Sequence, residues 1–183
     1  FYRGRVYIGA TALEEGLGLA PGYVCCVFRG SESAVDAATG KVIWQRYTIA
    51  EEAKSQPNNK GGAPVMGPSG AGVWNTATLD PAHDTMFVNT GDNFSDPTTS
   101  TSDSIMALSM STGEILWSKQ FTAKDAWNNS CGFFMASDGS RTVSSLVPGP
   151  NVEVNEKCPD SDGPDFDFAS SSILVQLPNG RRA

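Results

Sequence analysis

An eleven-residue pattern occurs twice in this chain and narrows the folds that the chain can adopt. Residues 34–44 read AVDAATGKVIW, and residues 107–117 read ALSMSTGEILW. Both copies contain a leading Ala, a central Thr-Gly pair and a closing Trp, which is Trp44 in the first copy and Trp117 in the second. Alternating residues on either side of a Thr-Gly turn predict a β-hairpin. A hairpin repeated along one chain indicates an architecture built from repeated units.

The sequence around the two copies also reads as short strands and turns. After a long polar loop at 50–72, strands are predicted at 73–79, 86–90, 104–110 and 114–120, in the up-and-down order of one propeller blade. Nineteen glycines and eleven prolines agree with frequent turns. The sequence therefore predicts an all-β fold, either a sandwich or a propeller. The repeated Trp hairpin favours the propeller, because each blade would offer one Trp to its neighbour.

Charge and hydropathy argue against two classes of partner. The 183 residues carry a formal net charge of −7, and the pI is about 4.6, whereas a nucleic-acid-binding protein needs a basic surface. No apolar run approaches the roughly 18 residues that a membrane span requires. We therefore expect neither a nucleic-acid partner nor a membrane span. The opening residues FYRGRVYIGA read as the middle of a strand, so we expect a fragment or a processed piece of a longer protein.

Four cysteines are present: the adjacent Cys25 and Cys26, then Cys131 and Cys158. They allow three complete pairings, and four buried thiols are the alternative. A bridge between Cys131 and Cys158 would contribute about 3–4 kcal/mol in the loop-entropy model. If disulfides form, the compartment is oxidising, such as a periplasm or the outside of the cell. The chain contains no CxxC or CxxCH, so this stretch predicts neither a zinc ribbon nor a covalently attached c-type haem.

The repeated motif AxDxxTGxxxW resembles the tryptophan-docking motif of the eight-bladed quinoprotein alcohol dehydrogenases, which use pyrroloquinoline quinone (PQQ) and a Ca²⁺ or lanthanide ion. The second copy departs from it, with Ser109 where the family has Asp. Further stretches are similar to the polyvinyl alcohol dehydrogenase branch and follow its order: ALEE, YVCCVFRGS, GPSGAGVWNTATLDP, TGDNFSDP, KDAWN and GPDFDFASSSILV. The resemblance implies that residues 1–183 form about two to three four-stranded blades of a propeller. Blade motifs would end at Trp44 and Trp117, and a third blade would begin near Ser170.

The resemblance also implies a cofactor site. Trp74 occurs where the family has a Trp that forms the floor under the quinone ring; an ordinary core Trp is the alternative. Cys25 and Cys26 would form a vicinal disulfide near the quinone, although here the pair follows the Glu-containing strand, unlike in the better-known members. Arg29 would pair with a cofactor carboxylate, and a structural role is the alternative.

Metal ligands follow from the same comparison. Glu14 matches the family's metal-ligating Glu, with Glu15 as its competitor. Asp92 occurs where the family has an Asn ligand, and Asn93 is the candidate if the loop is shifted by one residue. Oxygen donors of this kind suit a hard cation. Solvated loop carboxylates are the alternative.

Asp165 and Asp167 are the candidate catalytic residues. The run DFDF resembles the family's Asp-x-Asp segment, although Pro164 occupies the family's Trp position. When the segment is aligned with the family without gaps through the following SSSILV, Asp165 falls on the catalytic base. Residues i and i+2 of a strand share a face, so both carboxylates could point at one site. One carboxylate would ligate the metal while the other takes the alcohol proton. The KDAWN stretch, with Asp125 and Asn128, also resembles part of this motif, and a pair of exposed acids is the alternative reading.

Together these features imply oxidation of an alcohol, either polyvinyl alcohol or a secondary alcohol. The metal would act as a Lewis acid on the quinone, an Asp as general base, and the electrons would pass to a cytochrome c or to a haem domain outside this stretch. We expect a periplasmic or extracellular location. Two alternatives remain: a non-catalytic propeller scaffold, similar to the outer-membrane β-barrel assembly lipoprotein, or a fragment that is inactive alone.

Overall fold

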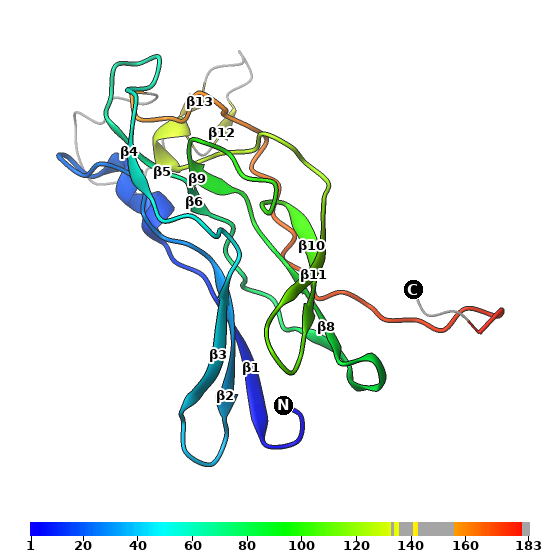
Figure 1. The fold of residues 1–183 in the computed structure, drawn as a ribbon. Coiled ribbons are helices and arrows are strands. Elements are labelled where there is room, and N and C mark those ends of the chain that lie inside the picture. Colours follow the sequence, from blue (N-terminus) through cyan, green and yellow to red (C-terminus); the bar gives the residue numbers. More distant parts are fainter. Residues whose placement is uncertain (133, 136–140, 143–155, 181–183) are drawn as a thin grey trace.

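The computed structural model describes residues 1–132, 134–135, 141–142 and 156–180 (Figure 1). The described chain is built of strands, short 3₁₀ helices and loops, so the predicted all-β class is confirmed. Its strands are β1 (Arg5–Ala10), β2 (Ser31–Asp36), β3 (Val42–Tyr47), β4 (Lys54–Gln56), β5 (Val65–Gly67), β6 (Ser69–Gly70), β7 (Thr78–Asp80), β8 (Thr85–Asn89), β9 (Asn93–Ser95), β10 (Ser104–Ser109), β11 (Ile115–Gln120), β12 (Phe134–Met135) and β13 (Arg141–Thr142). The 3₁₀ helices are η1 (Glu14–Leu19), η2 (Pro81–His83) and η3 (Asn129–Cys131). None of the helices in these residues is long and apolar enough to cross a membrane.

The first copy of the motif forms the β2–β3 hairpin. These strands and β1 make a three-stranded antiparallel sheet in the order β1-β2-β3. The carboxylate of Asp36 accepts hydrogen bonds from the backbone N–H groups of Ala38 and Thr39 and from the Thr39 hydroxyl, and Gly40 takes a φ of 72°. These contacts explain the Asp, Thr and Gly of the motif, because the Asp satisfies the turn's N–H groups and only Gly takes positive φ without strain.

The second copy forms the β10–β11 hairpin in a four-stranded sheet ordered β11-β10-β8-β7. The predicted up-and-down succession of four strands is therefore present. The first strand is shorter than expected, because β7 begins only at Thr78. Ser109 replaces the turn Asp in part: its hydroxyl accepts from the Thr112 N–H at 3.2 Å and donates to Asp84 at 2.8 Å.

The two copies pack on each other. The Trp44 indole N–H donates to the carbonyl of Met110 at 3.1 Å. A Cβ on Gly113 would lie 2.5 Å from the Trp44 ring, so the first Trp covers the Thr-Gly turn of the second copy. Figure 1 shows the two sheets side by side. The buried cluster between them consists of Val73, Met86, Val88, Met106, Leu108 and Met110.

Short pairings organise the long loops at the opposite end of the sheets from the β2–β3 turn (Figure 1). The loop predicted at 50–72 contains β4, which pairs with β5, and β6, which pairs with β9. A disulfide joins Cys131 to Cys158, and another joins Cys25 to Cys26. Segment 170–180 contains no strand of two or more residues. The carbonyls of Ser170 and Ser172 accept hydrogen bonds from side chains of the four-stranded sheet.

Candidate functional site

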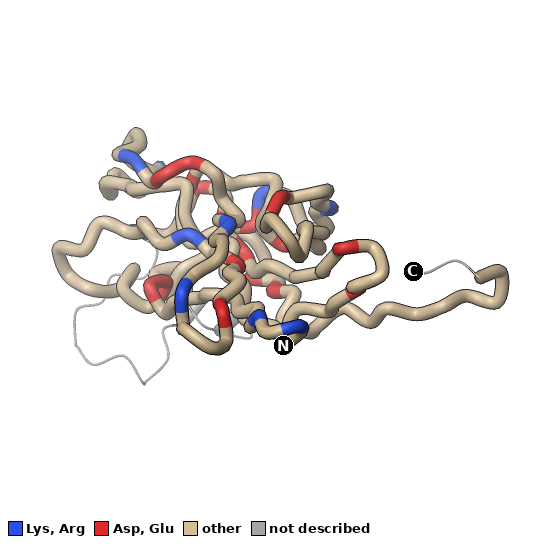
Figure 2. The backbone as a smooth tube through the Cα atoms, turned by 60° about the horizontal axis from the view of Figure 1, so that its bottom comes forward, with Lys and Arg blue, Asp and Glu red and all other residues tan. Residues whose placement is uncertain are grey.

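Six carboxylates gather among the loops at the end of the sheets that lies opposite the β2–β3 turn, and we call them the acidic row. Figure 2 shows several of the acidic segments close together in the middle of the body. Burial first, and then the charges of the neighbouring carboxylates, raise the pKa values of five of them. The ion pairs found in the described residues, Arg29–Glu52 and His83–Asp80, include none of the six. The row consists of Glu15, Asp92, Asp103, Asp125, Asp165 and Asp167.

Asp92 lies at the centre of the row and is 2% exposed. Its carboxylate accepts from the Trp127 N–H at 3.0 Å, and its own N–H donates to Asp167 at 3.2 Å. Burial first, and then the charges of Asp167 and Asp165, raise the pKa of Asp92 to about 10. The neighbouring Asn93 is outside the row, because its side-chain amide bonds to Ser69 and Thr99 within the loops.

The structure separates the two adjacent glutamates of ALEE. The carboxylate of Glu14 accepts hydrogen bonds from the Val27 N–H at 2.9 Å, from the Phe28 N–H at 2.7 Å and from the Tyr23 hydroxyl. Glu15 instead faces the row: burial, and then the charge of Asp167, raise its pKa. The metal-ligand candidate Glu14 therefore lies outside the row, and its competitor Glu15 lies within it.

A small cavity of about 90 Å³ lies between Glu15, Asp92 and Asp167, and we call it the Trp74 cavity. Trp74 lines it with a ring that is half exposed, at 52%. A Cβ on Gly91 would lie 2.0 Å from Asp167 Oδ1 and 3.6 Å from the Trp74 ring nitrogen. Glycine at this position thus lets a carboxylate and a flat aromatic surface approach the same backbone segment.

Asp125 holds the segment that carries both catalytic candidates. Its Oδ1 accepts from the Asp165 N–H at 3.2 Å, and its Oδ2 accepts from the Phe166 N–H at 3.1 Å. Partial loss of solvent, then the charges of Asp167, Glu15 and Asp125, raise the pKa of Asp165 to about 7. Loss of solvent also raises the pKa of Asp167, although the hydrogen bond from Asp92 opposes the shift. Asp125, the other aspartate that resembled the catalytic motif, is therefore a backbone anchor for Asp165.

Asp103 joins the row although no sequence pattern singled it out. Its side chain is fully buried, and neither carboxylate oxygen accepts a hydrogen bond. Burial first, then the charges of Asp125, Asp167 and Asp165, raise its pKa to about 8. An isolated Asp in the polar run STSDS looks like an ordinary turn residue, so the sequence carried no usable signal for its burial.

The row has the donor chemistry of a hard-cation site. Carboxylate oxygens are the ligands that Ca²⁺ prefers, and the buried carboxylate of Asp103 has no hydrogen-bond partner that would compete with a cation. Among the described residues, no three carboxylates of the row lie within 4.8 Å of one another, so a cation would have to draw them together. In the described part of the chain, the His, Cys, Asp and Glu side chains form one set of three donors within that distance. It consists of Cys131, Cys158 and Asp162, and its two sulfurs are joined in a disulfide.

The remaining cofactor candidates divide into two groups. Cys25 and Cys26 are buried against Phe94, a residue that also lines the Trp74 cavity. Arg29 lies elsewhere: its guanidinium donates to the carbonyls of Ile49 and Ala50. The same group pairs with Glu52 at 3.6 Å and covers the Tyr47 ring.

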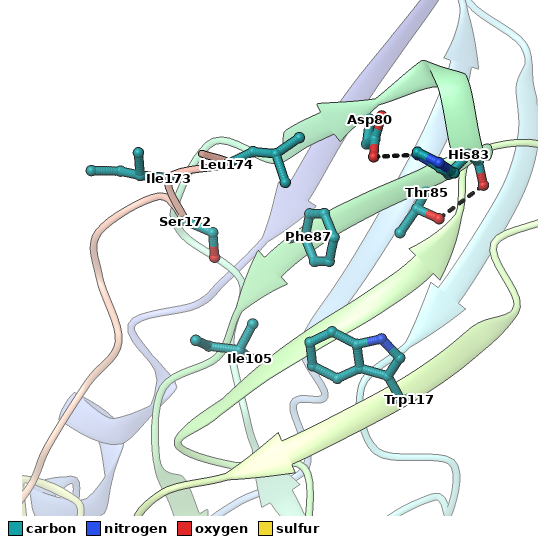
Figure 3. Close-up of a pocket in the computed structure, with 9 residues that line it drawn as sticks. All are labelled: Asp80, His83, Thr85, Phe87, Ile105, Trp117, Ser172, Ile173 and Leu174. Carbon is teal, nitrogen blue, oxygen red and sulfur yellow. Dashed lines mark hydrogen bonds and ion pairs between the residues drawn. The ribbon is translucent and has the colours of Figure 1, made fainter. Parts of the chain in front are cut away.

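A larger cavity of about 610 Å³ opens on the outer face of the four-stranded sheet, away from the row, and we call it the outer cavity (Figure 3). Phe87, Ile105 and Trp117 form its floor, and Leu174 lies across it. The hydrogen-bonded pair of Asp80 and His83 lies at its rim, with 2.7 Å between His83 Nδ1 and Asp80 Oδ2. No member of the acidic row lines this cavity.

Comparison with known proteins agrees with this architecture. A family model described as "Glucose/ethanol/alcohol dehydrogenase, beta-propeller domain" (PQQ) matches residues 25–131. Polyvinylalcohol dehydrogenase of Sphingopyxis sp. is 31% identical over 99% of this chain and 25% of its own length. The Pseudomonas sp. polyvinylalcohol dehydrogenase is 29% identical, again over 25% of its own length. The chain thus spans about a quarter of these curated relatives.

Solved structures of the same kind share the fold. A quinohemoprotein alcohol dehydrogenase from Pseudomonas putida aligns with a TM-score of 0.51 and 26% identity over 70% of this chain and 20% of its own. The quinohemoprotein alcohol dehydrogenase of Comamonas testosteroni aligns with a TM-score of 0.52 and 20% identity over 99% of this chain and 23% of its own, which supports the fold alone. With more than half of its residues matched by the family model, this chain belongs to the PQQ β-propeller family of glucose, ethanol and alcohol dehydrogenases.

Proposed function

We propose that the protein containing this chain is a PQQ- and metal-dependent alcohol dehydrogenase. The observation that carries the proposal is the half-exposed Trp74 beside a cavity lined by carboxylates with raised pKa values. A large flat indole offers a stacking surface for a planar ring, and the carboxylates offer oxygen ligands to a hard cation. Membership of a PQQ family makes this pairing of surfaces the expected one.

In this proposal Glu15, Asp92 and Asp167 hold the cation, a Ca²⁺ or a lanthanide ion. Glu15 takes the role first expected of Glu14, whose carboxylate is already bonded to backbone N–H groups. Asn93 has no role as a ligand in this proposal, because its side-chain amide donates to the Ser69 carbonyl and accepts from the Thr99 N–H.

Asp165 is the proposed general base. Its pKa, raised to about 7, leaves a carboxylate that accepts a proton near neutral pH. Asp125 holds the backbone of Asp165 in place, so the base would be positioned by a buried anchor. When bound, PQQ supplies the acceptor for the hydride and the cation supplies Lewis-acid polarisation. The residues of this chain would orient the ring, hold the cation and take the hydroxyl proton.

The proposal also covers the substrate, the electron acceptor and the cellular compartment. The similarity to polyvinylalcohol dehydrogenases favours polyvinyl alcohol or a secondary alcohol as substrate, and a cytochrome c would receive the electrons. Two disulfides indicate an oxidising compartment, and a periplasmic or extracellular location would meet that condition. Cys25 and Cys26 would lie beside the quinone. Arg29 keeps no place in the proposal, since its guanidinium is already paired.

The test reconstitutes the protein, including any sequence that flanks residues 1–183, with PQQ and Ca²⁺. Reduction of an artificial dye would be followed with 2-propanol, 1-propanol and polyvinyl alcohol. We expect turnover that needs both PQQ and metal and that falls at least about 100-fold in Asp165→Asn, the loss expected for a general base. Glu15→Gln should lose metal-dependent turnover as well. Failure of PQQ to bind, seen as unquenched Trp fluorescence, would favour the non-catalytic scaffold.

A further inference from the structure

Glu14 is buried at the start of η1, and its carboxylate is fully engaged. It is 8% exposed and accepts from two consecutive backbone N–H groups, those of Val27 and Phe28. The Tyr23 hydroxyl donates to the same carboxylate, which raises the pKa of Tyr23 to about 12 after the larger effect of burial. Hydrogen bonds to an ionised acceptor are among the strongest available to a side chain. Glu14 thereby ties the start of η1 to residues 23–28.

These three donors bracket the vicinal cysteines. Tyr23 precedes Cys25 and Cys26, and Val27 follows them directly. On the other side, the Cys26 N–H donates to the Met66 carbonyl, and the Met66 N–H donates to the Cys25 carbonyl, both at 2.9 Å. The cysteine pair is therefore held between β5 and the Glu14 carboxylate.

The cysteine pair lies behind Phe94, which is part of the wall of the Trp74 cavity. Cys25 and Cys26 pack on Phe94, and Phe28 stacks on the same ring with centroids 6.1 Å apart. Phe94 lines the cavity together with Trp74. Release of the loop from Glu14 would leave the cysteine pair held only by its hydrogen bonds to Met66.

We propose that Glu14 is a positioning residue, which fixes the Cys25–Cys26 pair at the wall of the Trp74 cavity and takes no part in metal binding. The assignment rests on the proposed function only in taking that cavity as the cofactor site. A Glu14 that ligated a cation would have to leave the N–H groups of Val27 and Phe28 without acceptors, at the cost of unpaired buried donors. Glu15, one residue on, already lines the Trp74 cavity together with Asp92 and Asp167 and needs no such rearrangement.

The test compares Glu14→Gln with Glu15→Gln in the protein including any flanking sequence. Glutamine keeps the shape of the side chain but replaces one of the two acceptor oxygens by an NH₂ group, which cannot accept from the donors that face it, so the loop should open more often. The first readout is the rate at which tris(carboxyethyl)phosphine reduces Cys25–Cys26, followed by alkylation and peptide mass spectrometry. We expect reduction about tenfold faster in Glu14→Gln, the size of one lost charge-assisted hydrogen bond, and unchanged within twofold in Glu15→Gln.

The second readout is Tb³⁺ binding, followed by its luminescence. We expect Glu15→Gln to weaken binding at least about tenfold, as for a lost ligand, and Glu14→Gln to leave the affinity within threefold of the unsubstituted protein. Equal losses of Tb³⁺ affinity in the two variants would overturn the proposal, because Glu14 would then be a ligand. Neither readout needs PQQ or an alcohol, so the outcome is separate from that of the dehydrogenase assay.

Two further variants separate positioning from general stability. Val88→Ala removes volume from the core of the four-stranded sheet, where Val88 is 1% exposed. If it accelerates reduction of Cys25–Cys26 as much as Glu14→Gln does, the effect is global and the proposal fails.

Tyr23→Phe deletes one of the three donors and covers the case in which Glu14→Gln does not fold. It should accelerate reduction about threefold with Tb³⁺ binding intact, and an unchanged rate would overturn the proposal.

Discussion

A buried carboxyl group in the first sheet makes the stability of this protein depend on pH. Glu32 is 1% exposed, and neither of its carboxylate oxygens has a hydrogen-bond partner. Burial raises the pKa of Glu32 from 4.5 to about 8. Between these values the unfolded chain binds fewer protons at this position than the folded chain does. The free energy of unfolding should therefore fall as pH rises from 4.5 to about 8, by up to a few kcal/mol.

Glu32→Gln removes this dependence, because an amide does not ionise. Urea unfolding at pH 5, 7 and 9 should show a smaller loss of stability with pH in Glu32→Gln than in the unsubstituted chain. The exposed Glu51→Gln serves as the matched control and should keep the original slope. The same slope in all three proteins would contradict the role assigned to Glu32.

Gly91 gives a second prediction at the scale of single residues. Its φ is not in the left-handed region, so Gly91→Ala strains only the contact of the new Cβ, which would lie 2.0 Å from Asp167 Oδ1. Displacement of Asp167 should weaken Tb³⁺ binding roughly tenfold, since a carboxylate ligand moves away. Gly16→Ala is the control, because its Cβ would meet only Asn129 at 3.5 Å. Equal affinities in both variants would remove Asp167 from the cation site.

Site residues were predictable from the sequence only to within a residue or so. The run TGDN pointed to Asp92 or Asn93, and ALEE to Glu14 or Glu15. Which member of each pair faces the row depends on the turn of the backbone and on remote N–H donors, such as that of Val27. Such donors lie in other segments of the chain, and no local sequence pattern shows that these segments will fold next to the glutamates.

At the scale of elements, the Thr-Gly turn of the second hairpin supports the first Trp. Gly40 and Gly113 share a φ of 72°. A Cβ on Gly40 would meet nothing within 4 Å, whereas a Cβ on Gly113 would lie 2.5 Å from the Trp44 ring. Gly40→Ala should therefore cost about 1 kcal/mol from backbone strain alone. Gly113→Ala should cost a further 1–3 kcal/mol from overpacking.

Chemical denaturation of both variants measures this difference directly. The excess loss in Gly113→Ala should disappear when Trp44 is replaced by Ala, because the side chain that the Cβ would meet is then absent. An equal loss of stability in Gly113→Ala and Gly40→Ala would contradict docking of the first repeat on the second.

The repeated motif made the two hairpins predictable, because their turns are encoded by contiguous residues. The short strands β4, β5, β6 and β9 were not predictable. Each has only two or three residues, which is too short for a clear alternating pattern. β4 pairs with β5 inside the loop, and β6 pairs with the more distant β9, as with Ser69 and Ser95. The polar composition of 50–72 therefore read as a loop, although these pairings give it structure.

At the scale of the whole molecule, the two repeats differ in what covers their Trp residues. Trp44 packs on the next hairpin, whereas Trp117 occupies the same motif position and remains 47% exposed at the floor of the outer cavity (Figure 3). Ile173, which also lines the outer cavity, is 83% exposed. In repeat architectures each unit buries its apolar face only against a neighbour. The outer face of this sheet thus has the composition of an interface between blades.

Residues 1–183 expressed alone should therefore self-associate through this face, as large exposed apolar surfaces do. Sedimentation equilibrium should give an apparent mass above that of the monomer, and Trp117→Lys should return it to the monomer value. Trp74→Lys is the matched control: Trp74 is equally exposed, at 52%, but lies at the acidic row and should leave association unchanged. A monomer in all three cases would mean that segment 172–174, which crosses the outer cavity, already covers Trp117 well enough. Reversal by the Trp117 variant alone would instead locate the association at Trp117, whose counterpart in the first repeat, Trp44, packs on Gly113.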